Sequence, residues 1–243
     1  WDKGPYYQSK RAELYQDALL KLKQQELLYP CFCSRADLHA AQAPHASDGA
    51  YVYARTCRDL SKSEREELFK HKIPATRIRV PHKTYAFEDK VYGQTSQNLS
   101  KLCGDFIVQR ADEVFAYQLA VVVDDADMGV TEVVRGSDLL SSTPRQLYLQ
   151  DVLGFSHPIY AHLPLLVAPD GRRLSKRNHD LDLGVLRDQG KTPEEILGFL
   201  AYCIGLAEKE EPLSAAQVAN RFSWDVLRAH RKNVVVEHFS HVL

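Results

Sequence analysis

Three short apolar segments in the middle of the chain do most to limit what it can fold into. They are Asp105–Gln109, Val114–Val123 and Thr131–Val134, and a helix start follows them at Ser142-Thr143-Pro144. Proline is favoured in the first turn of a helix because its missing N–H has no partner there anyway. Short buried strands that alternate with helices are typical of α/β proteins, so we predict an α/β core with a parallel, doubly wound sheet.

The composition is that of a folded protein with balanced charge. Of 243 residues, 44% are apolar and 26% are charged, and the formal net charge is −1. These values exclude a disordered or fibrous chain and a histone-like electrostatic binder. No apolar run approaches the ~18 residues that a membrane span needs. The odd count of 5 cysteines argues against a disulfide framework, so we expect a reducing, cytoplasmic location with metal-bound thiolates.

Periodic and capping patterns predict further elements on both sides of the core. Residues Tyr7–Leu28 have the apolar spacing of a helix, whereas Thr76–Val80 and Tyr85–Val91 alternate like strands. A serine or threonine followed three residues later by glutamate or glutamine marks a helix start, because each side chain caps a backbone N–H group of the other. Such pairs begin at Ser61, Thr192 and Ser214. We therefore expect the C-terminal part of the chain to be helical.

Three cysteines near the N-terminal end have the chemistry of a zinc site. Cys31 and Cys33 are one residue apart, and Cys57 follows later in the same segment. Zinc prefers four nitrogen, sulfur or oxygen ligands in a tetrahedron, and three thiolates supply most of these. Tyr53, His45 and His39 are the candidates for the fourth ligand. The alternative is that the cysteines are small buried apolar residues.

Two basic regions could bind phosphate groups. A glycine turn precedes the loop Arg172–Arg177, whose cations and hydroxyl could clamp phosphates during phosphoryl or nucleotidyl transfer. Residues 55–83 also carry more lysine and arginine than acid, which could favour a nucleic-acid backbone. In both cases the alternative is a solvated basic surface.

Tyr117 and Arg135 bracket the apolar strand–turn region of the core. An arginine just past the carboxyl end of a parallel strand lies where α/β folds bind ligands, and its guanidinium suits a carboxylate. If the apolar segment is instead helical, Val121 lies on the same face as Tyr117. The alternative for Arg135 is an ion pair with Asp124, Asp125 or Asp127.

These motifs occur together, and in the same order, in one family. The chain resembles the glutamyl-tRNA synthetase group of class I aminoacyl-tRNA synthetases. The stretch with Gln8, Arg11 and Tyr15 resembles a segment that follows the first half of the family's catalytic fold. Residues 117–136 resemble its amino-acid-binding segment, and Arg173-Leu174-Ser175-Lys176-Arg177 resembles the KMSKS signature in its K-L-S-K form.

The resemblance implies roles for individual residues. It implies one structural zinc per chain, bound by Cys31, Cys33, Tyr53 and Cys57. It implies that Tyr117 and Arg135 bind L-glutamate. It also implies that ATP is bound by Arg173, Ser175 and Lys176, with Lys176 acting catalytically as charge builds on the departing pyrophosphate.

Three observations favour the family's short paralogues, which act on a modified anticodon base. Tyr53 precedes Cys57 by four positions, as in the paralogues' zinc site. Val121 stands where the tRNA-charging enzymes usually have asparagine, and the chain ends too soon after Lys176 for a helical anticodon-binding domain. The resemblance then implies activation of L-glutamate with ATP and Mg²⁺, and its transfer to queuosine in the anticodon of tRNA(Asp).

The expected architecture is a Rossmann-like class I catalytic core with two additions. We expect the core in residues 1–28 and 100–165, a zinc-bearing insertion in 29–99, and the KMSKS-like loop with a helical subdomain in 166–243. The only methionine is Met128, so we expect the first part of the core, with its HIGH signature, to lie upstream, and these residues alone to be inactive. Two alternatives are a truncated glutamyl-tRNA synthetase that charges the tRNA 3′ end and a non-catalytic zinc-containing RNA-binding module.

Overall fold

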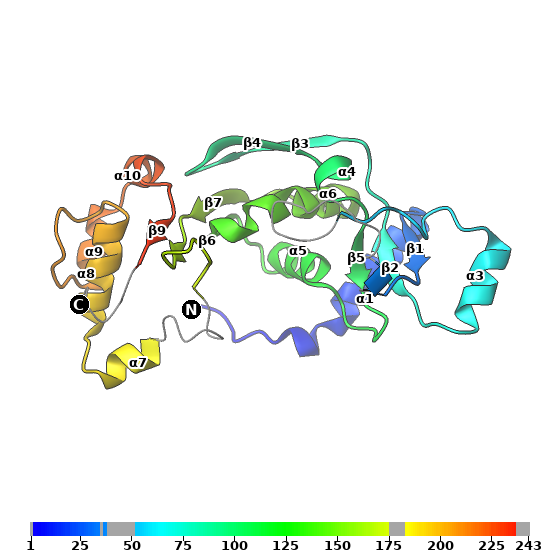
Figure 1. Ribbon diagram of the computed structural model, residues 1–243, viewed down its shortest axis with the longest axis horizontal. Coiled ribbons are helices and arrows are strands. Elements are labelled where there is room, and N and C mark those ends of the chain that lie inside the picture. The colour runs from blue at the N-terminus through cyan, green and yellow to red at the C-terminus, as the bar shows by residue number, and fades with distance from the viewer. Residues whose placement is uncertain (1, 35, 38–51, 175–182, 237–243) are drawn as a thin grey trace. The chain divides into compact units, whose positions relative to one another are not determined.

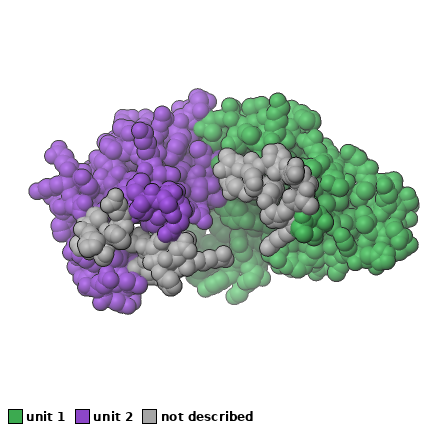
Figure 2. Space-filling view, in the orientation of Figure 1, with its two compact units in different colours: residues 1–87, 95–132, 141–158 green, residues 88–94, 133–140, 159–243 purple. Residues whose placement is uncertain are grey.

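The computed structural model describes residues 2–34, 36–37, 52–174 and 183–236, and Figure 1 shows the order of their helices and strands. The chain divides into two compact units, which are coloured separately in Figure 2. Unit 1 comprises residues 1–87, 95–132 and 141–158, and unit 2 comprises residues 88–94, 133–140 and 159–243. In the described part of the chain, no helix is long and apolar enough to cross a membrane.

Unit 1 combines an antiparallel sheet with a group of packed helices. Its main elements are η1 (Gln8–Lys10), α1 (Ala12–Gln24), β1 (Leu28–Cys31), α3 (Lys62–Phe69), β2 (Ala75–Ile78), α4 (Leu99–Leu102), β5 (Phe106–Gln109), α5 (Tyr117–Asp127) and α6 (Thr143–Leu153). The sheet has the order β1-β2-β5, with Leu28 opposite Ile78 and Thr76 opposite Gln109.

The core of unit 1 lies where α1, α5 and α6 pack against one another (Figure 1). Each helix contributes a fully buried leucine to it, namely Leu22, Leu119 and Leu149. Helix α6 is buried on nearly all its faces, and it ends at Gly154, whose φ of 73° lies in the left-handed region. Glycine adopts this region without the penalty that a Cβ atom brings, so it stops the helix cleanly.

Unit 2 combines parallel strand pairs with short helices. Its elements are β6 (Glu132–Gly136), η2 (Ser137–Ser142), β7 (Ile159–Leu163), β8 (Leu166–Val167), α7 (Leu183–Asp188), α8 (Pro193–Cys203), α9 (Ala215–Arg221), α10 (Trp224–Ala229) and β9 (Val234–Val235). Strands β3 (Thr84–Asp89) and β4 (Gly93–Asn98) each run across the boundary between the two units in the sequence. The sheet order is β4-β3-β7-β6, with β3 parallel to β7 through Asp89 and Tyr160.

Most of the predicted elements are present. The structure is α/β, the helix starts at Ser61, Thr192 and Ser214 each form a complete capping box, and α7–α10 make the expected C-terminal helical part. The division into a core, a zinc-bearing insertion and a helical subdomain at the predicted boundaries stays a prediction.

Two expectations for the middle of the chain were wrong. The apolar segment before Asp124 is not a strand, because residues 117–127 form helix α5. Arg135 does not follow its strand but lies within β6. A short apolar run fits a buried strand and a buried helix equally well, so its sequence alone does not choose between them.

Candidate functional site

The three cysteines of the predicted zinc site converge in unit 1. Cys31 ends β1, and Cys33 and Cys57 lie in the loops that follow it. The three Sγ atoms lie within 4.8 Å of one another, and those of Cys33 and Cys57 are 3.6 Å apart. Cys31 and Cys57 are buried, and Cys33 is half-buried. A single metal ion could therefore contact all three sulfur atoms.

The hydroxyl of Tyr53 lies beside two of these thiols. Its oxygen lies 3.5 Å from the Sγ of Cys31 and 3.8 Å from the Sγ of Cys33. A tetrahedron with metal–sulfur bonds of about 2.3 Å has sulfur–sulfur edges of about 3.8 Å and slightly shorter sulfur–oxygen edges. The two spacings from the Tyr53 oxygen and the 3.6 Å between Cys33 and Cys57 are close to these edges, so the donor set suits a zinc ion. The other two candidates, His39 and His45, lie outside the described residues.

Arg77 of β2 controls the electrostatics of this cluster. Its Nε atom donates a hydrogen bond of 3.1 Å to the Sγ of Cys31, and its guanidinium lies 3.8 Å from the centre of the Tyr53 ring. Burial would raise the pKa of the Cys31 thiol, but the positive charge of Arg77 and the hydrogen bonds from Tyr53, Arg77 and the Cys33 backbone together outweigh burial and lower it.

Two further candidate ligands, Cys33 and Tyr53, have raised pKa values. Burial and the neighbouring Cys31 raise the pKa of Cys33 to about 12. Burial and the contacts with Cys31 and Cys57 raise the pKa of the Tyr53 phenol. The backbone N–H of Cys57 donates a 2.8 Å hydrogen bond to the Tyr53 oxygen, and such a bond stabilises a phenolate once a cation displaces its proton.

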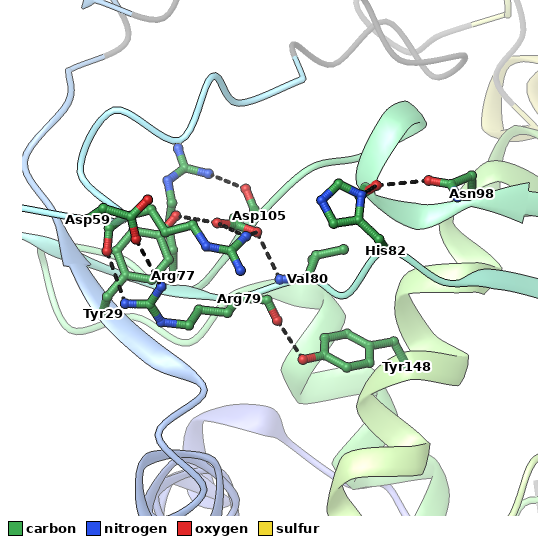
Figure 3. A network of polar contacts seen from close by, with 11 residues as sticks. Tyr29, Asp59, Arg77, Arg79, Val80, His82, Asn98, Asp105 and Tyr148 are labelled. Atoms are coloured by element: carbon green, nitrogen blue, oxygen red, sulfur yellow. Dashed lines mark hydrogen bonds and ion pairs between the residues drawn. The ribbon is translucent and has the colours of Figure 1, made fainter.

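A buried carboxylate, Asp105, ties the thiol cluster to the rest of unit 1. Its oxygens accept hydrogen bonds from the Tyr29 hydroxyl, the Arg58 guanidinium and the Val80 backbone N–H, at 2.8 to 3.0 Å. Its backbone carbonyl accepts one of 2.8 Å from Arg77. Figure 3 shows Asp105 between Tyr29, Arg77 and Val80. One network therefore links the cluster to the residues that follow β2.

This network also changes the interpretation of the basic run at residues 55–83. Arg58 pairs with Asp105, Arg79 with Asp59, and Lys83 with Asp151. Arg79 and Asp59 are drawn together in Figure 3. Because these cations are paired with acids of the same unit, the surplus of positive charge in the sequence overstates what is available to a phosphate backbone.

The stretch with Gln8, Arg11 and Tyr15 is anchored to the last turns of α5. All three side chains donate to the carboxylate of Asp124, at 2.8 to 2.9 Å, and Arg11 also pairs with Asp127. Burial and the adjacent Asp124 raise the pKa of Tyr15 to about 12. The motif therefore fastens the N-terminal segment to α5, which begins with the half-exposed Tyr117.

Within unit 2, Arg135 contacts His162, the Leu139 carbonyl and the Tyr160 ring. Its Nε donates a 3.0 Å hydrogen bond to the Nε2 of His162, and its Nη2 reaches the Leu139 carbonyl at 3.4 Å. The guanidinium lies 5.3 Å from the centre of the Tyr160 ring. Of the acids considered as its ion-pair partners, Asp124 and Asp127 pair with Arg11.

The basic loop is described only at its start. Gly171 turns the chain with a φ of 80°, Arg172 pairs with Asp170, and Arg173 pairs with Asp138 of η2. Ser175, Lys176 and Arg177 lie outside the described residues. Of the predicted site residues, the structure brings together Cys31, Cys33, Tyr53 and Cys57, whereas Tyr117 belongs to unit 1 and Arg135 and Arg173 to unit 2.

The sequence of the chain matches one family along almost its whole length. The family described as tRNA synthetases class I (E and Q), catalytic domain, matches residues 1–240. A protein named glutamyl-Q tRNA(Asp) synthetase from Symbiobacterium thermophilum is 47% identical over 95% of this chain and 72% of its own length. Proteins of the same name from Geobacter sulfurreducens and Rhodopirellula baltica are 49% and 41% identical. This chain spans 58% and 78% of their respective lengths.

The fold matches that of solved glutamate–tRNA ligases. A glutamate tRNA ligase from Elizabethkingia meningosepticum, solved in complex with its amino acid, superposes with a TM-score of 0.73. The glutamate–tRNA synthetase of Elizabethkingia anophelis gives 0.74. Both are 24% identical and cover 96% of this chain, which spans 52% and 53% of their lengths. These likenesses show a shared fold.

Proposed function

Because the chain belongs to the class I tRNA synthetases for glutamate and glutamine, we propose that it activates L-glutamate with ATP and Mg²⁺ and transfers it to queuosine in the anticodon of tRNA(Asp). The observation that carries this proposal is 47% identity, over 95% of the chain, to a protein named for this activity. The partners of the reaction are then L-glutamate, ATP and tRNA(Asp) carrying queuosine. The free thiols of the cysteine cluster support a cytoplasmic location.

Zinc has a structural role in this proposal. Cys31, Cys33, Tyr53 and Cys57 would hold one ion, and four protein ligands leave no open position for a substrate. A closed zinc site supplies folding free energy rather than chemistry. The spacing of the four ligand atoms and the hydrogen bonds from Arg77 and Cys57 support this assignment.

Recognition of glutamate would rest on Arg135 and Tyr117. An acidic side chain needs a fixed cation, and the planar guanidinium offers a carboxylate two parallel N–H donors. Tyr117, half-exposed at the start of α5, has a phenol that can hydrogen-bond the amino acid. Val121 follows one helical turn later on the same face of α5.

Activation would depend on the positive charge of the KMSKS-like loop. Arg173, Ser175 and Lys176 would bind ATP, and Lys176 would stabilise the charge that develops on pyrophosphate as glutamate attacks the α-phosphorus. Arg173 pairs with Asp138 of η2. This contact anchors the start of the loop that follows β8.

The decisive substrate for testing this function is tRNA(Asp) itself. We expect glutamate transfer to tRNA(Asp) that contains queuosine, and none to the same tRNA purified from cells that cannot make queuosine. The protein should be assayed at the full length of its relatives. Equal transfer to both tRNAs would contradict the proposal and favour an enzyme that charges the 3′ end.

A further inference from the structure

Arg77 is a buried cation that contacts two of the four proposed zinc ligands. The residue is 5% exposed, and its Nε donates a 3.1 Å hydrogen bond to the Sγ of Cys31. The same guanidinium lies 3.8 Å from the centre of the Tyr53 ring. Cys31 ends β1, whereas Tyr53 lies in the loop before α3. One side chain therefore contacts ligands from two separate segments of the site.

The register of the sheet explains how Arg77 reaches Cys31. In the antiparallel pair of β1 and β2, Arg77 lies opposite Tyr29, two residues before Cys31. Residues two apart in a strand point to the same face, so Cys31 is the diagonal neighbour of Arg77 and lies within reach of its long side chain. The pairing of β2 with β5 changes register between Thr76 and Arg77. Such an irregularity re-aims side chains next to a site.

Asp105 holds the other end of the guanidinium (Figure 3). Its backbone carbonyl accepts a 2.8 Å hydrogen bond from the Nη1 of Arg77. Its carboxylate accepts hydrogen bonds from Tyr29, Arg58 and Val80. A buried polar network of this kind holds its members in one arrangement. The Nε–H of Arg77 is therefore already directed at the Cys31 sulfur.

The charge of Arg77 suits an occupied metal site. A zinc ion bound by three thiolates and a phenolate forms a group of net negative charge, because the anionic ligands outweigh one divalent ion. Burying a charge alone is costly, and the cost falls when an opposite charge lies in contact with it. The guanidinium and the occupied site are therefore counter-charges for each other. A neutral, metal-free cluster would not offer Arg77 this counter-charge.

We propose that Arg77 is a positioning residue of the zinc site, which orients Cys31 and Tyr53 towards the ion and balances the charge of the occupied site. Its hydrogen bond fixes the direction of the Cys31 sulfur, as partners of metal ligands commonly do. Its attraction to the aromatic face holds Tyr53 in place. This inference rests on the zinc assignment of the proposed function and does not depend on the substrate.

Two substitutions separate the charge of Arg77 from its geometry. Arg77→Met keeps a long side chain without the charge or the hydrogen bond, whereas Arg77→Lys keeps the charge but loses the planar stack and the Nε donor. Competition with a chromophoric zinc chelator, using the full-length protein, measures the affinity for zinc. We expect it to fall by roughly 100-fold in Arg77→Met and by roughly tenfold in Arg77→Lys, the range that partners of metal ligands contribute.

Arg79→Met is the matched control. Arg79 also lies over a tyrosine ring, 5.0 Å from the centre of Tyr29, and it pairs with Asp59. Neither contact is with a proposed zinc ligand, so Arg79→Met should bind zinc as wild type does. A wild-type zinc affinity in Arg77→Met, or equal losses in Arg77→Met and Arg79→Met, would overturn the inference and leave the zinc assignment intact. A folded wild-type protein that binds no zinc would overturn both.

A measurement on the wild-type protein tests the same contact without any variant having to fold. With ¹¹³Cd in place of zinc and ¹⁵N-labelled arginine, the Nε–H proton of Arg77 should show scalar coupling to the metal across its hydrogen bond to the Cys31 sulfur. The coupling should vanish with a cadmium isotope that has no nuclear spin. Absence of the coupling from the ¹¹³Cd-loaded protein would overturn the inference. Neither measurement uses glutamate or tRNA, so neither result depends on the proposed activity.

Discussion

The thiol cluster of unit 1 and the surroundings of Arg135 in unit 2 are built in opposite ways. The four proposed zinc ligands come from one short stretch, residues 31–57, and three spacings between their atoms are 3.5 to 3.8 Å. Arg135 contacts Tyr160 and His162, which lie about 25 residues later in the chain, and His162 is bound in turn by Asp89 from a third segment. The proposed structural site is thus local in the sequence, whereas the surroundings of the proposed substrate-binding arginine draw on distant parts of the chain.

The largest effect should come from removing one of the proposed zinc ligands. We expect Cys33→Ser to reduce bound zinc from about one equivalent to nearly none, measured by elemental analysis. The apparent binding free energy of structural zinc, roughly 10–16 kcal/mol, is comparable with the whole stability of a domain. The midpoint temperature of thermal unfolding should therefore fall strongly. Cys203→Ser in α8, outside the cluster, is the matched control and should keep the zinc. A folded wild-type protein without metal would contradict the assignment.

The KMSKS-like loop should give the next largest effect. Lys176→Ala should slow glutamate activation by roughly 10²-fold or more, because it removes one contact made mainly in the transition state. The affinity for ATP should change much less. Lys62→Ala, at a side chain that is 92% exposed, is the control. If Lys176→Ala activates glutamate at the wild-type rate, the loop is only a solvated basic surface.

Replacing Arg135 should have a smaller and more selective effect than replacing Lys176. Arg135→Lys keeps the charge but loses the planar fork, so the glutamate KM should rise by roughly tenfold, the size of one hydrogen bond to a charged group. Val121→Asn introduces the polar residue of the tRNA-charging relatives and should lower the glutamate KM. Glutamate-dependent ATP–pyrophosphate exchange measures both. An unchanged glutamate dependence in Arg135→Lys would remove this arginine from the site.

The smallest expected effect is a change of stability with pH. Burial would raise the pKa of Asp89, but its hydrogen bonds from His162, Tyr92 and Val91 outweigh burial and lower it. A carboxyl with a depressed folded-state pKa stabilises the protein above its unfolded pKa of about 4, and this stability is lost as the pH falls through the folded value.

Urea unfolding at pH 7 and below pH 4 measures this contribution. The loss of unfolding free energy between the two conditions should be smaller in Asp89→Asn than in wild type. Asp112→Asn, at a half-exposed carboxylate, should behave like wild type. An identical pH dependence in all three proteins would show that Asp89 contributes nothing to it.

Features whose partners are close in the sequence could be predicted from it. The capping pairs at Ser61 and Thr192 predict helix starts that the structure confirms, because donor and acceptor are three residues apart. The spacing of Cys31, Cys33 and Cys57 likewise predicts a shared ligand set, and the structure brings their sulfur atoms together.

Features that depend on distant partners could not be predicted. Tyr29 and Asp105 are 76 residues apart, and Asp89 and His162 are 73 apart, so no local pattern links them. Arg77 was counted only as part of a basic run. The signal that could have found it is an arginine within an apolar strand, since a charge in such a place needs a buried partner.

The most direct test of the central claim is the position of the glutamate on its product. The full-length enzyme should be incubated with labelled L-glutamate, ATP and tRNA(Asp) that contains queuosine, and the tRNA then cleaved into separate anticodon and 3′-terminal fragments. The account predicts that the label is in the anticodon fragment, on the queuosine nucleoside. Label in the 3′-terminal fragment would contradict it.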